Sequence, residues 1–264
     1  MTSHTGTALV TGASSGIGAA YADQLAARGH NLILVARDAA RLRAAAERIG
    51  QKTGVAVEVM AADLTQPADL AAVRDRVATD ADLGLIVNCA GLGPLGPSLD
   101  SPAELYDGML DLNVRALQTL TFAAARAFAD RGEGTIVNVS SVVALIPECF
   151  NAGYAAQKAF VLALTQGLAA EIGAKGVRLQ AVLPGITRTE FFDRAGADIE
   201  QIPAEMIMEA PDLVAAALAG LDASEIVTIP SLPEIVDWQA FEAARLHLGP
   251  NLSRRVPAAR YDLG

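Results

Sequence analysis

Tyr154 and Lys158 lie four residues apart in the segment NAGYAAQKAF, which otherwise is typical of an alanine-rich helix. Residues at i and i+4 lie one above the other on a helix, with Cβ atoms about 5 to 6 Å apart, so an ammonium can lie beside a phenol. Such a pair can hold and deliver a proton. An isolated YxxxK is more often two solvated surface residues, because short motifs match by chance. The rest of the chain decides between these interpretations.

A glycine-rich loop, TGASSGIG (11–18), follows the apolar run TALV directly and opens a helical pattern. This is the context that a dinucleotide-binding loop requires. Gly12 can turn the chain sharply, Gly16 lets the backbone approach a pyrophosphate, and Gly18 allows the helix to pack close to the sheet. The spacing is GxxxGxG rather than GxGxxG. The alternative interpretation is an ordinary glycine-rich turn.

Two hydrophobic periods alternate along the chain. Short runs that are apolar on both faces are typical of central parallel strands, and they span 7–12, 31–37, 55–64, 83–91, 134–141, 177–185 and 225–231. Stretches with helical spacing lie between them, at 16–28, 38–50, 67–80, 102–130 and 152–174. The alternation predicts an α/β fold, a Rossmann-type doubly wound parallel sheet of about seven strands with helices on both faces.

We expect a single domain over residues 1–264, since no linker or repeat interrupts the pattern. Residues from about 186 to 210 form its predicted substrate lid. Residues from about 232 to 264 form a C-terminal extension, with a helix and its docking strand.

The composition excludes several classes of protein. With 52% hydrophobic and 19% charged residues, the chain is typical of a compact globular protein. Its net charge of −10 argues against a nucleic-acid or anionic membrane partner. Cys89 and Cys149 form no disulfide framework or zinc pattern, so no metal site is predicted. There is no apolar run long enough for a membrane span and no secretory pattern at the N-terminus, so a cytoplasmic protein is expected.

Six motifs in order resemble the short-chain dehydrogenase/reductase family over roughly residues 5–190. TGASSGIG is similar to the family's cofactor loop, NCAG (88–91) to its NNAG element, and PGITRT (184–189) to the PGxxxT segment at the nicotinamide end. Asn113, Ser141, Tyr154 and Lys158 match the catalytic asparagine, serine, tyrosine and lysine. The resemblance implies cofactor contacts from Gly12, Ser14, Ser15, Gly16, Ile17, Gly18, Arg37, Asp63, Leu64, Asn88, Ala90, Gly91, Tyr154, Lys158, Pro184, Gly185 and Thr189.

The resemblance gives each catalytic position a task in the reduction of a ketone. Tyr154 supplies the proton where alkoxide charge develops. Lys158, together with the oxidised nicotinamide ring, is expected to lower the pKa of the phenol and also binds the nicotinamide ribose. Ser141 polarises the substrate oxygen, with Ser140 as an equal candidate. Asn113 links Lys158 to solvent through its backbone and a water; the alternatives are a turn serine and a helix-kinking asparagine.

The end of the second strand predicts the cofactor. An acidic residue there binds the ribose hydroxyls of NAD, but VARD places Ala36 at that position and Arg37 next. A guanidinium can bind a 2′-phosphate, so NADP(H) is predicted, with Arg41 in support and NAD(H) as the second choice. Arg37 as a solvated strand-end residue is the alternative, and Asp38 complicates the choice if the strand ends one residue later. Asp63 resembles the family residue that contacts adenine.

Two departures from the family pattern are visible. Cys89 replaces the second asparagine of NNAG, which removes a hydrogen bond. EIVTIPSLPEIVDW stands where many tetrameric members have a glycine-rich segment. We expect a homodimer or homotetramer, with contacts through the helices 102–130 and 152–174, which are apolar beyond one stripe.

The substrate pocket is predicted from 91–97, 145–151 and 190–209, where no cluster of basic residues lies. Apolar side chains there form either an adaptable lining or part of the core: Phe191, Phe192, Met206, Ile207 and Met208. The predicted function is an NADP(H)-dependent carbonyl reductase or alcohol dehydrogenase that acts on a fairly apolar ketone or secondary alcohol. The alternatives are a 3-oxoacyl thioester reductase and a catalytically silent, cofactor-sensing interaction protein.

Overall fold

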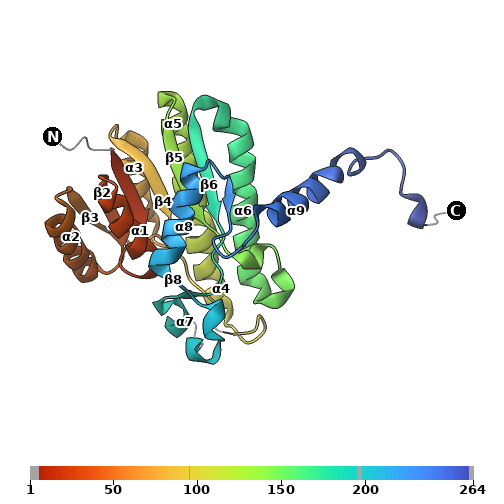
Figure 1. Ribbon diagram of the computed structural model, residues 1–264, viewed down its shortest axis with the longest axis horizontal. Helices are drawn as coiled ribbons and strands as arrows, with labels where there is room; N and C mark the ends of the chain where they lie inside the picture. Colours follow the sequence, from red (N-terminus) through yellow and green to blue (C-terminus); the bar gives the residue numbers. More distant parts are fainter. Residues whose placement is uncertain (1–5, 95, 195–197, 262–264) are drawn as a thin grey trace. The chain divides into compact units, whose positions relative to one another are not determined.

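The computed structural model describes residues 6–94, 96–194 and 198–261. In this part of the chain, seven parallel strands form one sheet in the order β3-β2-β1-β4-β5-β6-β9 (Figure 1). The strands are β1 (Thr7–Thr11), β2 (Asn31–Ala36), β3 (Val57–Ala61), β4 (Leu83–Asn88), β5 (Gly134–Val139), β6 (Val177–Val182) and β9 (Val227–Thr228). All strands predicted from the apolar runs are present, and the doubly wound α/β fold is confirmed.

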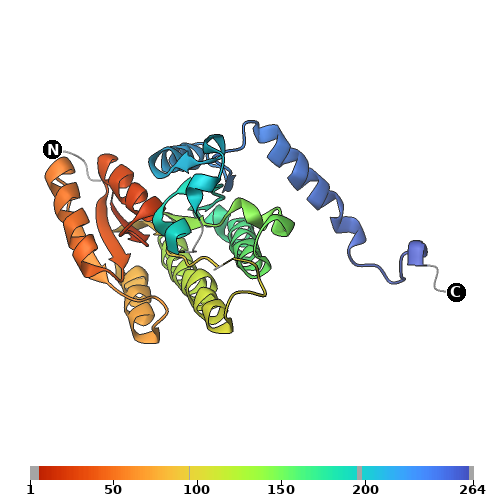
Figure 2. The same cartoon turned by 90° about the horizontal axis from the view of Figure 1, so that it is seen from below.

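Helices cover both faces of this sheet (Figure 2). One layer contains α1 (Gly16–Ala27), α2 (Ala39–Thr53) and α8 (Ala210–Asp222). The other contains α3 (Pro67–Thr79), α5 (Leu117–Arg131) and α6 (Ala152–Ile172), with α4 (Ala103–Leu110) joined to α5 by a π-helical segment, Asp111–Ala116. The predicted long helix at 102–130 is therefore interrupted.

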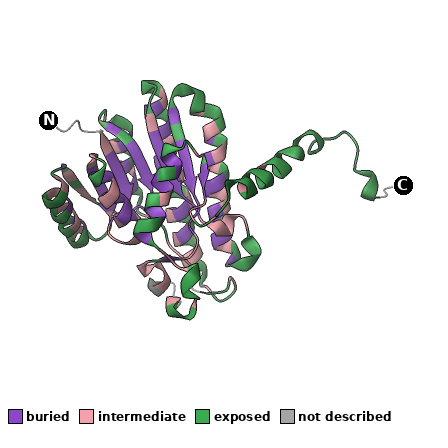
Figure 3. Ribbon diagram, in the orientation of Figure 1, coloured by how far each residue is buried: buried purple, intermediate pink, exposed green. Residues whose placement is uncertain are grey.

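Each strand contributes alternate side chains to two separate cores, because successive residues of a strand point to opposite faces. Val10, Leu34 and Val87 pack with α1 and α8, whereas Leu9 and Ile86 pack with α3 and α5. The inner strands of the sheet are accordingly mostly buried (Figure 3), whereas the edge strand β3 has no buried residue. This two-sided burial explains why the strand sequences are apolar on both faces.

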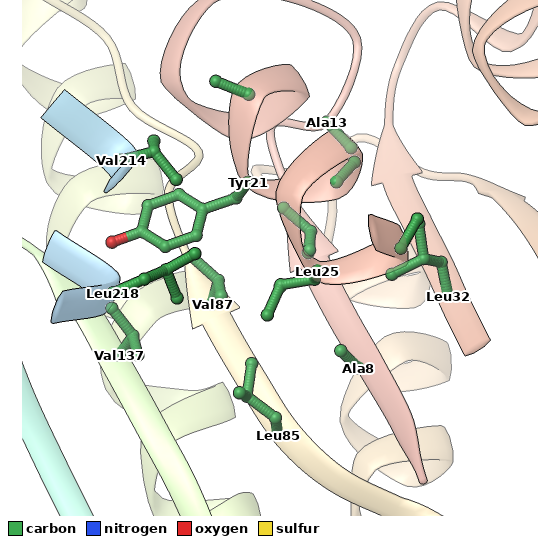
Figure 4. Packing of buried hydrophobic residues seen from close by; sticks show 14 of the residues in the cluster. Ala8, Ala13, Tyr21, Leu25, Leu32, Leu85, Val87, Val137, Val214 and Leu218 are labelled. Carbon is green, nitrogen blue, oxygen red and sulfur yellow. The ribbon is translucent and has the colours of Figure 1, made fainter. Parts of the chain in front are cut away.

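Tyr21 of α1 is fully buried in the first of these cores, beside Val214 and Leu218 of α8 (Figure 4). Its hydroxyl is buried and has no hydrogen-bond partner among the described residues. Burial of the phenol raises its pKa, so the hydroxyl stays protonated. The ring therefore serves this core as a large apolar group.

Strand order reverses at β1, which pairs with β2 on one side and β4 on the other. Loops at the carboxyl ends of β1 and β4 diverge there onto opposite faces of the sheet. In open parallel sheets this switch point is where ligands bind. The glycine-rich loop follows β1 at this place.

A second, smaller element was not predicted. β7 (Thr187–Arg188) pairs with β8 (Met208–Glu209) in a parallel two-stranded sheet, and α7 (Glu190–Arg194) lies between them in the sequence. These elements fall within the predicted lid at 186–210, of which residues 195–197 lie outside the described residues.

The chain divides into two compact units, Met1–Ser231 and Leu232–Gly264. The second unit contains α9 (Ile235–His247), where Trp238 and Phe241 stack with ring centroids 5.5 Å apart. The predicted terminal helix is thus present. No docking strand occurs in residues 232–261, since the segment after α9 contains Pro250 and Pro257 and forms 3₁₀ turns. Within the described chain, no helix is long and apolar enough to span a membrane.

Candidate active site

A cleft of about 1730 Å³ opens at the carboxyl ends of the strands, on the switch point between β1 and β4. Its walls come from the glycine-rich loop, the ends of β2, β4 and β5, the first turns of α6, and the segments around 184–192 and 205–212. Segments far apart in sequence therefore meet at one opening. Most of the predicted site residues contribute to it.

Tyr154 and Lys158 lie on the first two turns of α6 and face the cleft. Asn151 begins this helix, and its Oδ1 accepts a hydrogen bond from the Tyr154 backbone N–H at 3.0 Å. Tyr154 is 8% exposed and Lys158 is 6% exposed. The Lys158 Nζ lies 5.5 Å from the centroid of the Tyr154 ring. The pair is thus buried against the cleft, which is not how two solvated surface residues lie.

The end of β5 fixes the position of Lys158. Lys158 Nζ donates to the Val139 carbonyl at 3.0 Å, while Ser140 Oγ donates to the Lys158 carbonyl at 2.7 Å. These reciprocal bonds tie the helix to the strand on either side of the lysine. An ammonium carries three donors, and a single acceptor serves it among the described residues. Its remaining donors are available to a group in the cleft.

Burial is the main influence on the pKa values of Tyr154 and Lys158. Burial raises the pKa of the phenol above its usual value, and the neighbouring Cys89 adds to the rise. Burial also lowers the pKa of Lys158 to about 8, because charge is costly in this poorly solvated place, although Cys89 opposes the shift. Desolvation is thus the largest influence on the phenol in the chain itself. The lowering of the phenol pKa by Lys158 together with the oxidised nicotinamide ring stays a prediction. A phenol in this state carries its proton at neutral pH.

The structure separates the two serine candidates after β5. Ser140 is 2% exposed and its hydroxyl is engaged with the Lys158 carbonyl. Ser141 begins the next turn, where its Oγ contacts the Pro184 carbonyl and the Val143 N–H at 3.4 Å. Both distances are long for hydrogen bonds, so the Ser141 hydroxyl can reorient toward a substrate oxygen. The geometry favours Ser141 over Ser140 as the residue that binds substrate.

Asn113 lies in the π-helical segment and is almost completely buried. Its side chain accepts from the Leu92 N–H, and its Nδ2 donates to the Leu92 carbonyl at 2.9 Å and to Gln157 at 2.8 Å. π-helical turns inside α-helices are frequent at functional sites. The amide of Asn113 thus holds the loop after β4 against α6, and only its backbone remains for a relay.

The glycine-rich loop has the conformations that its sequence predicts. Gly12 and Gly16 adopt φ of +71° and +55°, in the left-handed region that favours glycine. A Cβ on Gly18 would overlap the Gly12 carbonyl, so only glycine lets α1 approach this closely. The Ser15 side chain makes no capping bond, which leaves the first N–H groups of α1 directed at the cleft. This end of the cleft fits an anionic pyrophosphate.

Sixteen of the seventeen residues predicted to contact the cofactor lie on the cleft wall: Gly12, Ser14, Ser15, Gly16, Ile17, Gly18, Arg37, Asp63, Leu64, Ala90, Gly91, Tyr154, Lys158, Pro184, Gly185 and Thr189. Thr189 approaches the loop most closely, because a Cβ on Gly16 would lie 3.0 Å from its Cγ2. Asn88 is the predicted residue that is not on the wall: its Nδ2 donates to Asn138 at 2.9 Å and to Thr121 at 3.1 Å inside the core. Its side chain points away from the cleft because a polar network between β4, β5 and α5 needs its donors.

The two arginines at the end of β2 differ in their partners. Arg37 is exposed, lines the cleft and makes no ion pair among the described residues. Arg41 is paired: its Nη1 lies 2.8 Å from both carboxylate oxygens of Glu190, and its Nε lies 3.6 Å from Asp38 Oδ2. Asp38 also caps α2, accepting from the N–H groups of Ala40 and Arg41. Arg37 is therefore the better placed of the two for an incoming phosphate.

Aromatic rings enclose Tyr154. Its ring centroid lies 5.7 Å from that of Phe150 and 5.8 Å from that of Phe191. Phe191 also packs on Gly93, where any Cβ would overlap its ring. Phe191, Phe192, Met206, Ile207 and Met208 all line the cleft. Met208 also packs against the core between the sheet and α1 and α8, so both interpretations apply to it.

Asn151 and Gln157 were not predicted as part of the site. Asn151 caps α6 and donates to the Gly96 carbonyl at 3.0 Å and to the Tyr106 hydroxyl at 2.8 Å, which ties the loop after β4 to the start of the helix. An asparagine directly before an alanine-rich helix is a recognisable N-cap signal. Nothing in the local pattern marks Gln157, because its partner Asn113 lies on another helix.

Comparisons with known proteins agree with this geometry. The short chain dehydrogenase family matches residues 6–200. The chain belongs to this family. The structure of a short-chain dehydrogenase from Sphingobium yanoikuyae in complex with NADPH is 47% identical, with a TM-score of 0.93 over 97% of this chain and 100% of that one. A bulky-bulky ketone specific alcohol dehydrogenase from Comamonas testosteroni is 43% identical, with a TM-score of 0.90 over 98% of this chain and 99% of that one.

More distant members of the short-chain dehydrogenase family include 17-beta-hydroxysteroid dehydrogenase type 3 from Danio rerio and Homo sapiens. Each is 35% identical, and the aligned part covers 67% of this chain. It covers 59% and 57% of those two proteins, so this chain spans less than two thirds of their length.

Proposed function

We propose that this short-chain dehydrogenase is an NADP(H)-dependent carbonyl reductase or alcohol dehydrogenase for an uncharged ketone or secondary alcohol. One observation carries the proposal: the glycine-rich loop, Tyr154, Lys158 and an aromatic wall line the same cleft. The nicotinamide, when bound, supplies or accepts the hydride. Each remaining task in the reaction falls to a side chain on this wall.

Tyr154 donates the proton in the direction of reduction. Its raised pKa keeps the hydroxyl protonated at neutral pH, and the rings of Phe150 and Phe191 pack beside its own. Ser141 binds the substrate oxygen beside it. Lys158 binds ribose hydroxyls through its free donors, and its charge stabilises the phenolate that remains after proton transfer. Asn113 positions the loop after β4 and offers its backbone for the proton relay.

NADP(H) as the cofactor rests on Arg37, whose guanidinium is exposed at the end of β2 with no acidic residue at Ala36. The Sphingobium yanoikuyae relative, which binds NADPH, supports the same choice. NAD(H) is the second choice, since Asp38 lies next to the arginine.

An uncharged substrate follows from the charges around the open end of the cleft. Lys158 is the single basic residue among the described residues that line the cleft around Tyr154, whereas Glu205 and Asp212 are acidic. Glu209 also lines the cleft, but it pairs with Arg188 at 2.9 Å. A carboxylate or the phosphates of an acyl thioester would meet repulsion there. The apolar wall suits a ketone with substituents on both sides, and the Comamonas testosteroni relative is specific for bulky-bulky ketones. This charge pattern disfavours the 3-oxoacyl thioester alternative.

The test is the oxidation of NADPH and NADH, followed by absorbance, with a panel of ketones. The panel pairs small methyl ketones with ketones that are bulky on both sides, and adds an acyl thioester. We expect turnover with NADPH and the bulky uncharged ketones. Turnover with the thioester alone contradicts the substrate class, and cofactor binding without turnover of any ketone favours the catalytically silent alternative. A dimer or tetramer and a cytoplasmic location stay predictions.

A further inference from the structure

Arg41 and Glu190 connect two cleft walls that are 149 residues apart in sequence. Arg41 lies in the first turn of α2, next to the end of β2, and Glu190 begins α7. The Arg41 Nη1 donates to both carboxylate oxygens at 2.8 Å. The two side chains are 49% and 41% exposed, so the pair is accessible to a ligand in the cleft.

Two acidic side chains lie beside Arg41. Arg41 also faces Asp38 at 3.6 Å, so two carboxylates surround its guanidinium. Arg37 has no such partner among the described residues. An anion that enters at the end of β2 therefore meets two guanidinium groups. That of Arg37 has no ion pair among the described residues, and that of Arg41 is paired with Glu190.

We propose that Glu190 determines how tightly the 2′-phosphate of the cofactor binds, because its carboxylate competes with the phosphate for the guanidinium of Arg41. The proposal rests on the proposed use of NADP(H). An exposed ion pair contributes little free energy in water, whereas a phosphate carries up to two negative charges and binds a guanidinium through paired hydrogen bonds. Replacement of the Glu190 carboxylate by the phosphate at Arg41 is therefore favourable. Competition from the carboxylate makes the binding free energy of the phosphate smaller.

The exchange also reaches the catalytic end of the cleft. Glu190 directly precedes Phe191, whose ring packs on Gly93 and lies 5.8 Å from the Tyr154 ring. While Arg41 binds Glu190, the start of α7 is held against α2. Loss of the pair removes this restraint on the residue that covers Tyr154.

The test uses two probes that lack nicotinamide, so that it does not depend on catalysis. Adenosine 2′,5′-bisphosphate and adenosine 5′-monophosphate differ only by the 2′-phosphate, and calorimetry with the full chain gives both dissociation constants. Glu190→Gln should bind the bisphosphate about two- to fivefold more tightly, the range that an exposed ion pair allows. Binding of the monophosphate should be unchanged. Arg41→Ala should weaken the bisphosphate, and Glu190→Gln should have no effect in the Arg41→Ala background.

Glu58→Gln is the matched control. Glu58 makes a two-oxygen pair with Arg76 at 2.8 Å and is 47% exposed, but neither residue lines the cleft. The Glu58→Gln variant removes one negative charge, as Glu190→Gln does, and leaves the partners of Arg41 in place. The dissociation constants of both probes should therefore be unchanged. A second readout is hydrogen exchange at the Phe191 amide, which should quicken on addition of the bisphosphate and be quick in Glu190→Gln without ligand.

The outcomes separate this inference from the function on which it rests. If the wild-type chain prefers the bisphosphate, and Arg37→Ala removes the preference while Glu190→Gln changes nothing, the NADP(H) proposal stands and the role of Glu190 is refuted. If the wild-type chain binds both probes equally, both proposals are refuted. An equal gain in Glu58→Gln would show a general charge effect and would also refute the role of Glu190.

Discussion

Replacement of Tyr154 by phenylalanine removes the proposed proton donor and leaves the ring in place. The ring lies between Phe150 and Phe191, with centroid distances of 5.7 and 5.8 Å, and these contacts survive the change. The hydroxyl that is lost belongs to the ring that lies 5.5 Å from the Lys158 Nζ. A stable protein with an intact cleft and no acid is therefore expected.

The magnitude follows from the donor's role. A positioned general acid contributes about 10² to 10⁴ in rate, so kcat for ketone reduction should fall by that factor, equivalent to about 2.7 to 5.5 kcal/mol. Affinity for NADPH should change little, because Lys158 keeps its bond to Val139. Steady-state kinetics with a ketone and a separate NADPH titration measure the two effects.

Tyr21→Phe is the matched control for this variant. Its hydroxyl is buried without a hydrogen-bond partner among the described residues, outside the cleft. Loss of that hydroxyl should leave kcat unchanged and should not lower the free energy of unfolding. Near-normal turnover in Tyr154→Phe, with the same stability as Tyr21→Phe, would refute Tyr154 as the acid.

Three other predictions concern the lysine, the arginine and the cap. Lys158→Met should lower kcat and weaken NADPH binding together. In the wild-type chain, kcat/KM for reduction should fall near pH 8 as the ammonium loses its proton, and the variant should lack this transition. An unchanged pH profile contradicts this role of Lys158. Arg37→Ala should lower the NADPH/NADH ratio of kcat/KM about tenfold to hundredfold, the worth of charge-assisted hydrogen bonds, and an unchanged ratio would make Arg37 a solvated strand-end residue. Asn151→Ala should reduce the free energy of unfolding by about 0.5 to 2 kcal/mol in denaturant titration, whereas Asn151→Asp, which keeps the capping oxygen, should lose less; equal losses would show that the bonds to Gly96 and Tyr106 matter more than the cap.

Stability should also respond to the pKa of Lys158. The folded chain holds this proton less tightly than the unfolded chain, since burial lowers its pKa to about 8 from an ordinary value near 10.4. Between these values the unfolded state binds more protons, so the contribution of Lys158 to the free energy of unfolding rises with pH. Lys158→Met should flatten that part of the profile.

Local sequence determined the repeated elements of this protein. Runs apolar on both faces predict buried parallel strands, because only a sheet covered on both sides buries every residue of a strand. The same local rules identify the glycine-rich loop, where Gly12 and Gly16 need positive φ, and the i, i+4 pair of Tyr154 and Lys158. The order of motifs then indicated the family.

Tertiary structure decided what depends on contacts between distant segments. The sequence could not choose between Ser140 and Ser141, since the choice depends on which hydroxyl meets the Lys158 carbonyl of α6. It directed Asn88 to the cofactor, whereas the partners on β5 and α5 hold that amide in the core. Local periodicity does not predict these partners, because they lie on other strands and helices.

The electrostatics of the site were likewise decided by the fold. Spacing alone placed an ammonium beside a phenol, but the burial that raises the phenol pKa and lowers the lysine pKa comes from walls that distant segments form. The pairing of Arg41 with Glu190 appears only when α2 and α7 meet across the cleft. Residue types and their spacing are written in the sequence, whereas burial and long-range charge pairs exist only after the chain has packed.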